Sequence, residues 1–128
     1  EEAQKQPYTI VVFKVTGLAG VNKTRGRKCG DELIVTACGI ICRVFSHSPI
    51  FRIGGDEFVA FLKGNDYMKC GELLREFEDL SSDVTLVSAP DIAVRIVYGT
   101  AQSADGTEPY EEVFCRADEE KDQKKKGM

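Results

Sequence analysis

Two adjacent acids follow a pair of glycines in the stretch "FRIGGDEFVA", which spans residues 51–60. Asp56 and Glu57 supply carboxylate oxygens, the ligands that a hard divalent cation such as Mg²⁺ takes in proteins. The glycines would also let backbone N–H groups approach a phosphate. Acidic residues are equally frequent in solvated turns, where they keep a hairpin soluble. The spacing alone leaves both interpretations open.

The residues on either side of these acids show strand and helix patterns. Residues 8–15, "YTIVVFKV", form a β-branched run that is typical of a buried central strand. "IFRI" and "EFVAFL" flank Gly54-Gly55 as a β-hairpin, because Gly-Gly adopts the positive φ angles of a tight turn. An apolar stripe with helical spacing predicts a helix over residues 31–45; it consists of Leu33, Ile34, Ala37, Ile41, Val44 and Phe45.

The second half of the chain repeats this alternation. Leu73, Leu74, Phe77 and Leu80 predict a second helix, which opens near Asn65 or Asp66. Residues 92–98 alternate as a strand, and a last helix follows Thr107 and Pro109, with its stripe at Tyr110, Val113, Phe114 and Ala117. The order βαββαβ plus a helix predicts an α+β fold, a ferredoxin-like antiparallel sheet with helices on one side. In this sheet the first and third strands are antiparallel neighbours, so the two acids should face residues 14–17.

The composition restricts the class of protein. With 128 residues, of which 42% are apolar, the chain should form a single domain over residues 1–128. The absence of an apolar run near the roughly 20 residues of a membrane span, and the polar start "EEAQKQP", predict a cytoplasmic domain without a membrane segment. A net charge of −4 argues against a nucleic acid polymer as partner, whereas a single nucleotide remains possible.

The cysteines do not indicate a structural metal or a disulfide framework. There are five of them, an odd number without a C-x-x-C pair, and His47 is the one histidine of the chain. Cys38 and Cys42 have helical i,i+4 spacing, which favours packing on one helix face.

The stretch "RIGGDEF" resembles the signature of the GGDEF family, the diguanylate cyclases of bacterial signalling, which condense two GTP into cyclic di-GMP with release of pyrophosphate. "VVFKVTGLAGVNKTRGRKCGDELI" is similar to the family's strand, its following Asn and its helix-opening Gly-Asp. "VRIVYGTA" and "EEVFCRADEEKDQKKKG" resemble its Gly-x-Ala strand and its closing Ala-Asp helix. The resemblance covers the chain from Tyr8 onward and implies a palm-like nucleotide-cyclase fold; the family's opening helical segment would precede Glu1.

The resemblance implies roles for individual residues. Asn22 and Asp31 stand where the family recognises guanine, although Asp31 could instead cap a helix and Asn22 could be a loop residue. Gly17, Leu18 and Ala19 would offer backbone N–H groups to the β- and γ-phosphates. Lys125 matches a phosphate-binding lysine, with a solvated helix end as the alternative.

The implied catalytic centre lies at the hairpin. Asp56 matches a metal-binding acid, and Glu57 matches the acid that assists the second metal or activates the 3′-hydroxyl. The backbone carbonyl of Val15 would be a further ligand of Mg²⁺ or Mn²⁺. The family's other metal-binding Asp is replaced by Lys14, whose ammonium has no lone pair for a metal and should pair with Asp56 or Glu57.

Other departures from the family pattern surround this centre. Lys23 replaces an Asp and Arg27 replaces the customary His. Lys121 and Asp122 replace an apolar residue and a Tyr, from which we expect the last helix to fray. The inhibitory Arg-x-x-Asp before the hairpin is absent, so product inhibition there is not expected.

Three functions follow from the sequence. The first is a diguanylate cyclase domain that is weak or inactive because of Lys14 and that needs a second GGDEF domain, as a homodimer, to condense two GTP. The second is a non-catalytic module that senses GTP or docks a protein. The third is a ferredoxin-like interaction domain that binds no nucleotide.

Overall fold

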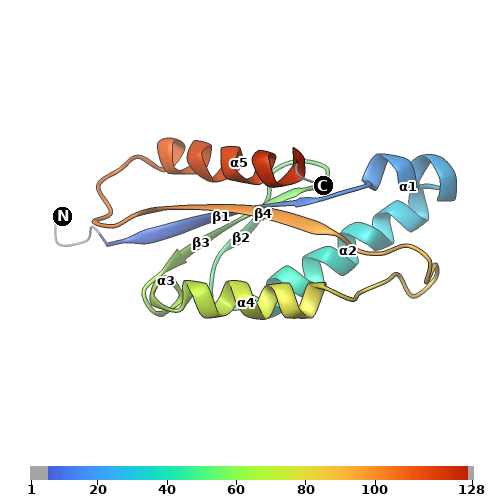
Figure 1. The fold of residues 1–128 in the computed structure, drawn as a ribbon, viewed down its shortest axis with the longest axis horizontal. Helices are drawn as coiled ribbons and strands as arrows, with labels where there is room; N and C mark the ends of the chain where they lie inside the picture. The colour runs from blue at the N-terminus through green and yellow to red at the C-terminus, as the bar shows by residue number, and fades with distance from the viewer. Residues whose placement is uncertain (1–5, 127–128) are drawn as a thin grey trace.

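A four-stranded antiparallel sheet with the strand order β2-β3-β1-β4 forms the centre of the fold (Figure 1). The computed structural model describes the backbone of residues 6–126 and the side chains of residues 6–124. The strands are β1 (Tyr8–Val15), β2 (Ile50–Arg52), β3 (Glu57–Lys63) and β4 (Ile96–Ser103). The helices are α1 (Leu18–Arg25), α2 (Arg27–Val44), α3 (Asn65–Met68), α4 (Cys70–Ser81) and α5 (Tyr110–Lys126). The predicted α+β fold and the hairpin are confirmed. The single helix predicted to open near Asn65 or Asp66 is two helices, because α3 ends at Met68 and α4, which carries the predicted stripe, begins at Cys70.

The central strand β1 contributes to two hydrophobic cores, because successive side chains of a strand point to opposite faces. Its first set, Val11, Phe13 and Val15, packs with α2 and α4, and its second set, Ile10 and Val12, packs with α5. The prediction of helices on one side therefore holds for α2 and α4, whereas α5 covers the opposite face (Figure 1). By the same alternation Lys14 lies on the α5 face.

The segment between β1 and β2 contains two helices where the sequence predicted one. Gly17 and Gly26 have positive φ angles of 85° and 93°, which favour glycine, and they precede α1 and α2 respectively. α2 starts at Arg27, four residues before the predicted start. The apolar stripe begins only at Leu33, so it could not indicate the first turn of the helix. Asp31 therefore lies inside the helix, and the alternative role as its N-cap is wrong.

The strand predicted over residues 92–98 is displaced in the structure. β4 starts at Ile96 and extends to Ser103. Ile92 and Val94 belong to the preceding loop, where the Ile92 carbonyl accepts a hydrogen bond from Leu86 and the Val94 N–H donates one to Val84. The sequence alternation arose because both side chains pack against the core from a loop.

The C-terminal half of α5 does not fray as predicted, since the helix continues to Lys126. Lys121 occupies the apolar position of the stripe but is only 2% exposed, and its ammonium is paired with acids. The Glu120 carboxylate accepts the Thr100 N–H of edge strand β4 at 2.6 Å, and the Lys124 ammonium lies 3.9 Å from the Tyr98 ring centroid. Polar contacts thus replace the expected apolar packing.

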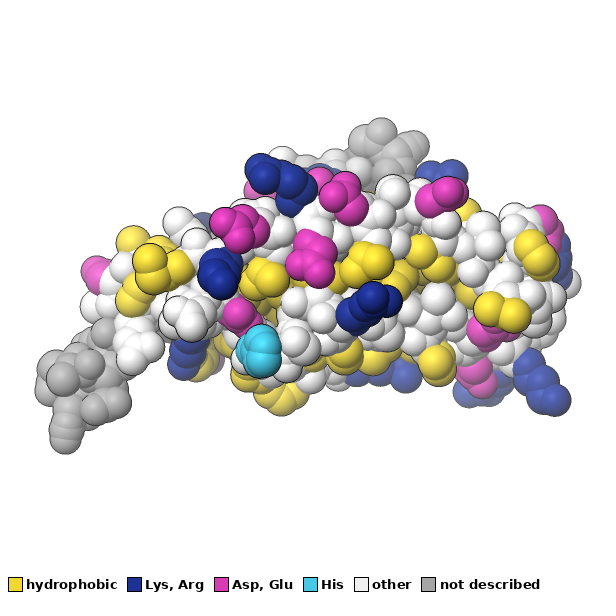
Figure 2. Space-filling model, turned by 90° about the horizontal axis from the view of Figure 1, so that it is seen from below, with side chains coloured by type: hydrophobic (Ala, Val, Ile, Leu, Met, Phe, Trp, Pro, Cys, Tyr) yellow, Lys and Arg dark blue, Asp and Glu magenta, His cyan; other side chains and the backbone are white. Residues whose placement is uncertain are grey.

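The face formed by α2 and α4 mixes hydrophobic side chains with charges of both signs (Figure 2). It therefore presents no continuous basic surface for a polyphosphate chain among the residues described. Across residues 6–126, none of the helices combines the length and the apolar character that crossing a membrane would require.

Candidate functional site

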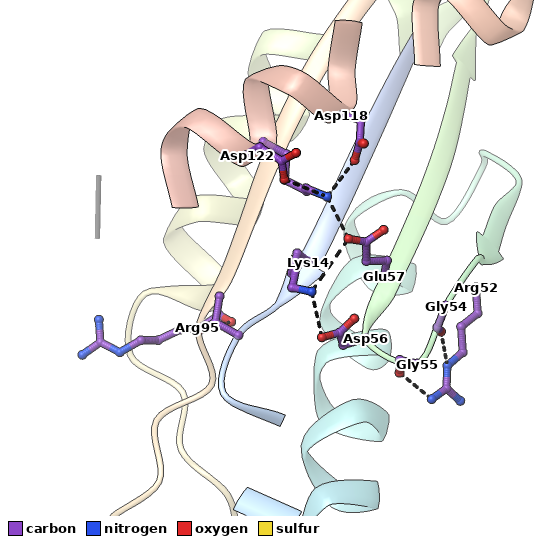
Figure 3. Close-up of polar contacts among 11 residues, drawn as sticks. Lys14, Arg52, Gly54, Gly55, Asp56, Glu57, Arg95, Asp118 and Asp122 are labelled. Carbon is purple, nitrogen blue, oxygen red and sulfur yellow. Dashed lines mark hydrogen bonds and ion pairs between the residues drawn. The ribbon is translucent and has the colours of Figure 1, made fainter. Parts of the chain in front are cut away.

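The end of β1 and the start of β3 bring the predicted catalytic residues together. Lys14 pairs in register with Glu57, and the Val15 N–H donates a hydrogen bond of 2.8 Å to the Asp56 carbonyl. The turn that carries the acids is stiffened by the Arg52 guanidinium, which donates to the carbonyls of Gly54 and Gly55 at 3.1 and 2.6 Å (Figure 3). Asp56, Glu57 and Val15 therefore adjoin one another, as predicted.

Lys14 forms the ion pairs that the sequence predicted. Its ammonium nitrogen lies 3.0 Å from Asp56 Oδ2 and 3.9 Å from Glu57 Oε2 (Figure 3). The Lys14 side chain is only 20% exposed, so solvent screens these pairs less than it would on an open surface. The ammonium lies between the two acids that the resemblance assigns to metal binding.

A second lysine, which the sequence analysis did not place here, contacts the same site from α5. The Lys121 ammonium lies 2.7 Å from Glu57 Oε2 and 2.7 Å from Asp118 Oδ1, with Asp122 Oδ1 at 3.4 Å. The i,i+4 spacing of Val113, Ala117 and Lys121 was the signal that could have found it, because the first two are fully buried.

The Lys121 ammonium is held in its charged form. Burial lowers its pKa, but hydrogen bonds from the ammonium to Asp118 and Glu57 outweigh this and raise the pKa above its ordinary value. Glu57 lies between two ammonium groups, that of Lys14 on β1 and that of Lys121 on α5.

The donor set of this site does not fit a divalent metal ion. Lys14 and Lys121 each direct an ammonium at the carboxylates, and an ammonium repels a cation and has no lone pair to donate. Among the described residues, no three His, Cys, Asp or Glu side chains are grouped as a metal site. Asp56, Glu57 and the Val15 carbonyl are adjacent, but each of the two carboxylates already has an ammonium partner.

The predicted phosphate-binding residues form the start of α1, directly after β1. Gly17 is the N-cap with left-handed geometry, and its carbonyl accepts the Val21 N–H at 3.0 Å. The N–H groups of Leu18 and Ala19 belong to the first turn, where a helix leaves its donors without intrahelical partners. Such a turn can bind an anion through these donors and the helix dipole.

The predicted guanine readers lie on neighbouring helices. A Cβ placed on Gly30 would lie 1.8 Å from Asn22 Oδ1, so the Asn22 amide of α1 rests directly on the α2 backbone next to Asp31. Both side chains are exposed. An amide and a carboxylate adjacent in this way offer the donor and acceptor types that a guanine edge requires.

The remaining predicted positions lie at the margins of the site. Lys23 and Arg27 are exposed on α1 and α2. Lys125 belongs to α5 by its backbone, but its side chain lies outside the described residues, so its phosphate-binding role stays a prediction.

A four-stranded antiparallel sheet with helices on both faces, and with an acidic hairpin beside a helix start, is the architecture of a palm-like α+β domain. The family model described as "Diguanylate cyclase, GGDEF domain" matches residues 1–128. The chain therefore belongs to the GGDEF family, as the resemblance implied.

Curated relatives with related sequences are diguanylate cyclases. DgcS of Shewanella oneidensis is 31% identical over 86% of this chain and 36% of its own length. DosC of Shigella sonnei is 27% identical over 88% of this chain, and the probable diguanylate cyclase DgcT of Escherichia coli is 29% identical over 91%. The chain spans 25% of DosC and 26% of DgcT, so it corresponds to one part of each of these proteins.

Solved structures share the fold. The active GGEEF domain of a diguanylate cyclase from Vibrio cholerae has a TM-score of 0.84 at 17% identity, over 98% of this chain and 81% of that one. The GGDEF domain of DgcB from Caulobacter crescentus, solved in complex with c-di-GMP, has a TM-score of 0.82 at 24% identity, over 98% of this chain and 76% of that one. These likenesses confirm the fold.

Proposed function

We propose that this GGDEF domain has weak or no diguanylate cyclase activity and retains a guanine-nucleotide site that functions without a divalent metal. The observation that carries the proposal is the 3.0 Å contact between the Lys14 ammonium and Asp56. GGDEF domains of diguanylate cyclases generally use a divalent metal, which activates the attacking hydroxyl and neutralises the phosphate under attack. Here the corresponding acids are engaged by lysines.

Nucleotide binding requires less of the site than condensation does. Asn22 and Asp31 would bind the guanine edge, and the N–H groups at Gly17, Leu18 and Ala19 would bind the phosphates. None of these residues depends on Asp56 or Glu57 for its position, since they belong to α1 and α2. Lys14 would offset part of the negative charge of Asp56 and Glu57, which would otherwise repel the phosphates.

Membership of the family supports a proposal for the ligand, the partner and the location of the domain. We propose GTP as its ligand, in the cytoplasm, and a second GGDEF domain as the partner that condensation would require. A structure of the diguanylate cyclase SiaD from Pseudomonas aeruginosa, 23% identical and with a TM-score of 0.81, contains the activator SiaC. A protein partner is therefore a second candidate ligand for the domain.

Calorimetric titration with GTP, in EDTA and in millimolar Mg²⁺, tests the proposal. We expect GTP to bind with nearly the same affinity in both, and we expect little or no cyclic di-GMP when the product is assayed by chromatography. A large gain in affinity with Mg²⁺, or rapid product formation, would contradict the proposal. Absence of GTP binding in both conditions would contradict the nucleotide site and favour protein docking.

A further inference from the structure

We infer that Lys121 is a second built-in cation of the site and that Lys14 and Lys121 each oppose divalent metal, so that both must be replaced before the site binds a metal ion tightly. The inference rests on the proposed loss of metal-dependent chemistry, and it assigns that loss to two residues on different elements. Glu57 lies between the two ammonium groups, 3.9 Å from Lys14 and 2.7 Å from Lys121. Among the residues that the structure describes, Asp56 has Lys14 as its one ion-pair partner.

The close packing of α5 on the sheet explains how a lysine of the last helix reaches β3. A Cβ on Gly99 of β4 would lie 2.1 Å from the Ala117 carbonyl oxygen and 2.3 Å from the Lys121 backbone nitrogen, so the helix backbone lies directly on the strand at this point. Lys121 follows Val113 and Ala117 on the buried stripe, and its side chain is only 3% exposed. Its ammonium therefore approaches Glu57 from the protein interior and not from solvent.

The charges of the site show why one substitution is insufficient. With an aspartate in place of Lys14, Asp56 would be free to bind a cation, but Glu57 would still be hydrogen-bonded to the Lys121 ammonium. A divalent ion there would have two free carboxylates, whereas the third, Glu57, would still be bound to the Lys121 ammonium, which Asp118 and Asp122 hold in place. Replacing both lysines would instead leave three converging carboxylates without an ammonium partner, next to Asp118 and Asp122, and a metal ion would relieve their mutual repulsion.

The experiment measures Mn²⁺ binding by calorimetry in the parent chain, Lys14→Asp, Lys121→Met and the double variant. Methionine keeps the unbranched stem of Lys121 in the core and removes its charge. We expect the double variant to bind Mn²⁺ at least about tenfold more tightly than Lys14→Asp, because unlike Lys14→Asp it frees Glu57 from the Lys121 ammonium, and contacting residues couple by an amount of this size. We expect no binding by the parent or by Lys121→Met.

The matched control is Lys124→Met in the Lys14→Asp background, which removes an equal charge from the same helix. Lys124 contacts the Tyr98 ring and none of the acids at the site. We expect this control to bind Mn²⁺ no better than Lys14→Asp alone. Equal tightening by the control would mean that net charge decides, and equal affinity of Lys14→Asp and the double variant would mean that Lys121 is irrelevant; either result overturns the inference.

The folding state of each variant is followed by circular dichroism in the same titration. If the double variant is unfolded without metal, folding on addition of Mn²⁺ supports the inference, and failure to fold or bind at saturating Mn²⁺ overturns it. GTP binding in EDTA is measured on the same samples. Metal binding as expected without GTP binding would leave the inference standing and refute the proposed nucleotide site.

Discussion

A single side chain changes the chemistry of the hairpin site. Asp56 and Glu57 occupy the positions that the family uses for metal chemistry, yet Lys14 on the adjacent strand holds a cation 3.0 Å from one of them. Asp56 and Glu57 are therefore not free to act as metal ligands. The sequence predicted the ion pair between Lys14 and the two acids, because a lysine on a neighbouring strand opposite two acids can form a cross-strand ion pair.

The prediction at the residue scale concerns the proposed role of Asp31 in guanine recognition. We expect Asp31→Ala to weaken GTP binding by about 1.5–3 kcal/mol, the magnitude of a hydrogen bond to a charged group, and to leave ATP binding unchanged. Because Asp31 is exposed inside α2 and does not cap it, the melting temperature should change little. Calorimetry with both nucleotides and a melting curve measure these effects. Equal losses for GTP and ATP would exclude the guanine role.

The closing helix illustrates what sequence patterns miss at the scale of an element. Lys121 breaks the apolar stripe, so the sequence predicted fraying, and nothing in a one-dimensional pattern indicates that Glu57, 64 residues away, provides its counter-charge. The strand predicted over residues 92–98 was displaced for a related reason, since alternation cannot distinguish a strand from a loop that buries every second residue. Both errors concern contacts between distant segments.

Gly99 gives the prediction at the element scale. We expect Gly99→Ala to destabilise the domain by about 1–3 kcal/mol, because the new methyl group would overlap the α5 backbone and push the helix off β4. The displacement should also separate Lys121 from Glu57. Denaturant unfolding measures the stability change.

Gly39→Ala is the matched control for this substitution. Gly39 lies within α2, and a Cβ there meets no atom within 4 Å. Alanine is a better helix former than glycine, so we expect this variant to be as stable as the parent or more stable by up to about 1 kcal/mol. Equal destabilisation by both substitutions would show that close approach of α5 to Gly99 is unimportant.

At the scale of the whole molecule, the fold was predictable to the extent that local patterns determine it. The order of the strands and of the longer helices and the hairpin followed from periodicity and turn chemistry, and the adjacency of Asp56, Glu57 and Val15 followed from the predicted strand pairing, whereas the short helices α1 and α3 were missed. The contact of Asn22 with Gly30 did not, because it depends on the packing of α1 against α2. The role of Lys121 was also not predictable, because it depends on the packing of α5 on the other face of the sheet.

The last prediction concerns the cooperativity of the domain. β1 is buried between α2 and α4 on one face and α5 on the other, so the two layers should unfold together. A ligand at α1 and α2 should therefore stabilise the entire domain. In EDTA, GTP at 100 times its dissociation constant should add about 2.7 kcal/mol to the free energy of unfolding. For a chain of this length the melting temperature should rise by roughly 10 °C.

Differential scanning calorimetry measures this rise in melting temperature. Two controls, the Asp31→Ala variant with GTP and the parent chain with ATP in place of GTP, should each show only a small part of it. The physical requirement is strict, because a ligand that binds only the folded state must raise the transition with concentration by mass action. Two separate transitions, of which only one responds to GTP, would show that the α5 layer unfolds independently. No shift at any GTP concentration would show that the start of α1 and the Asn22–Asp31 pair do not form a nucleotide site.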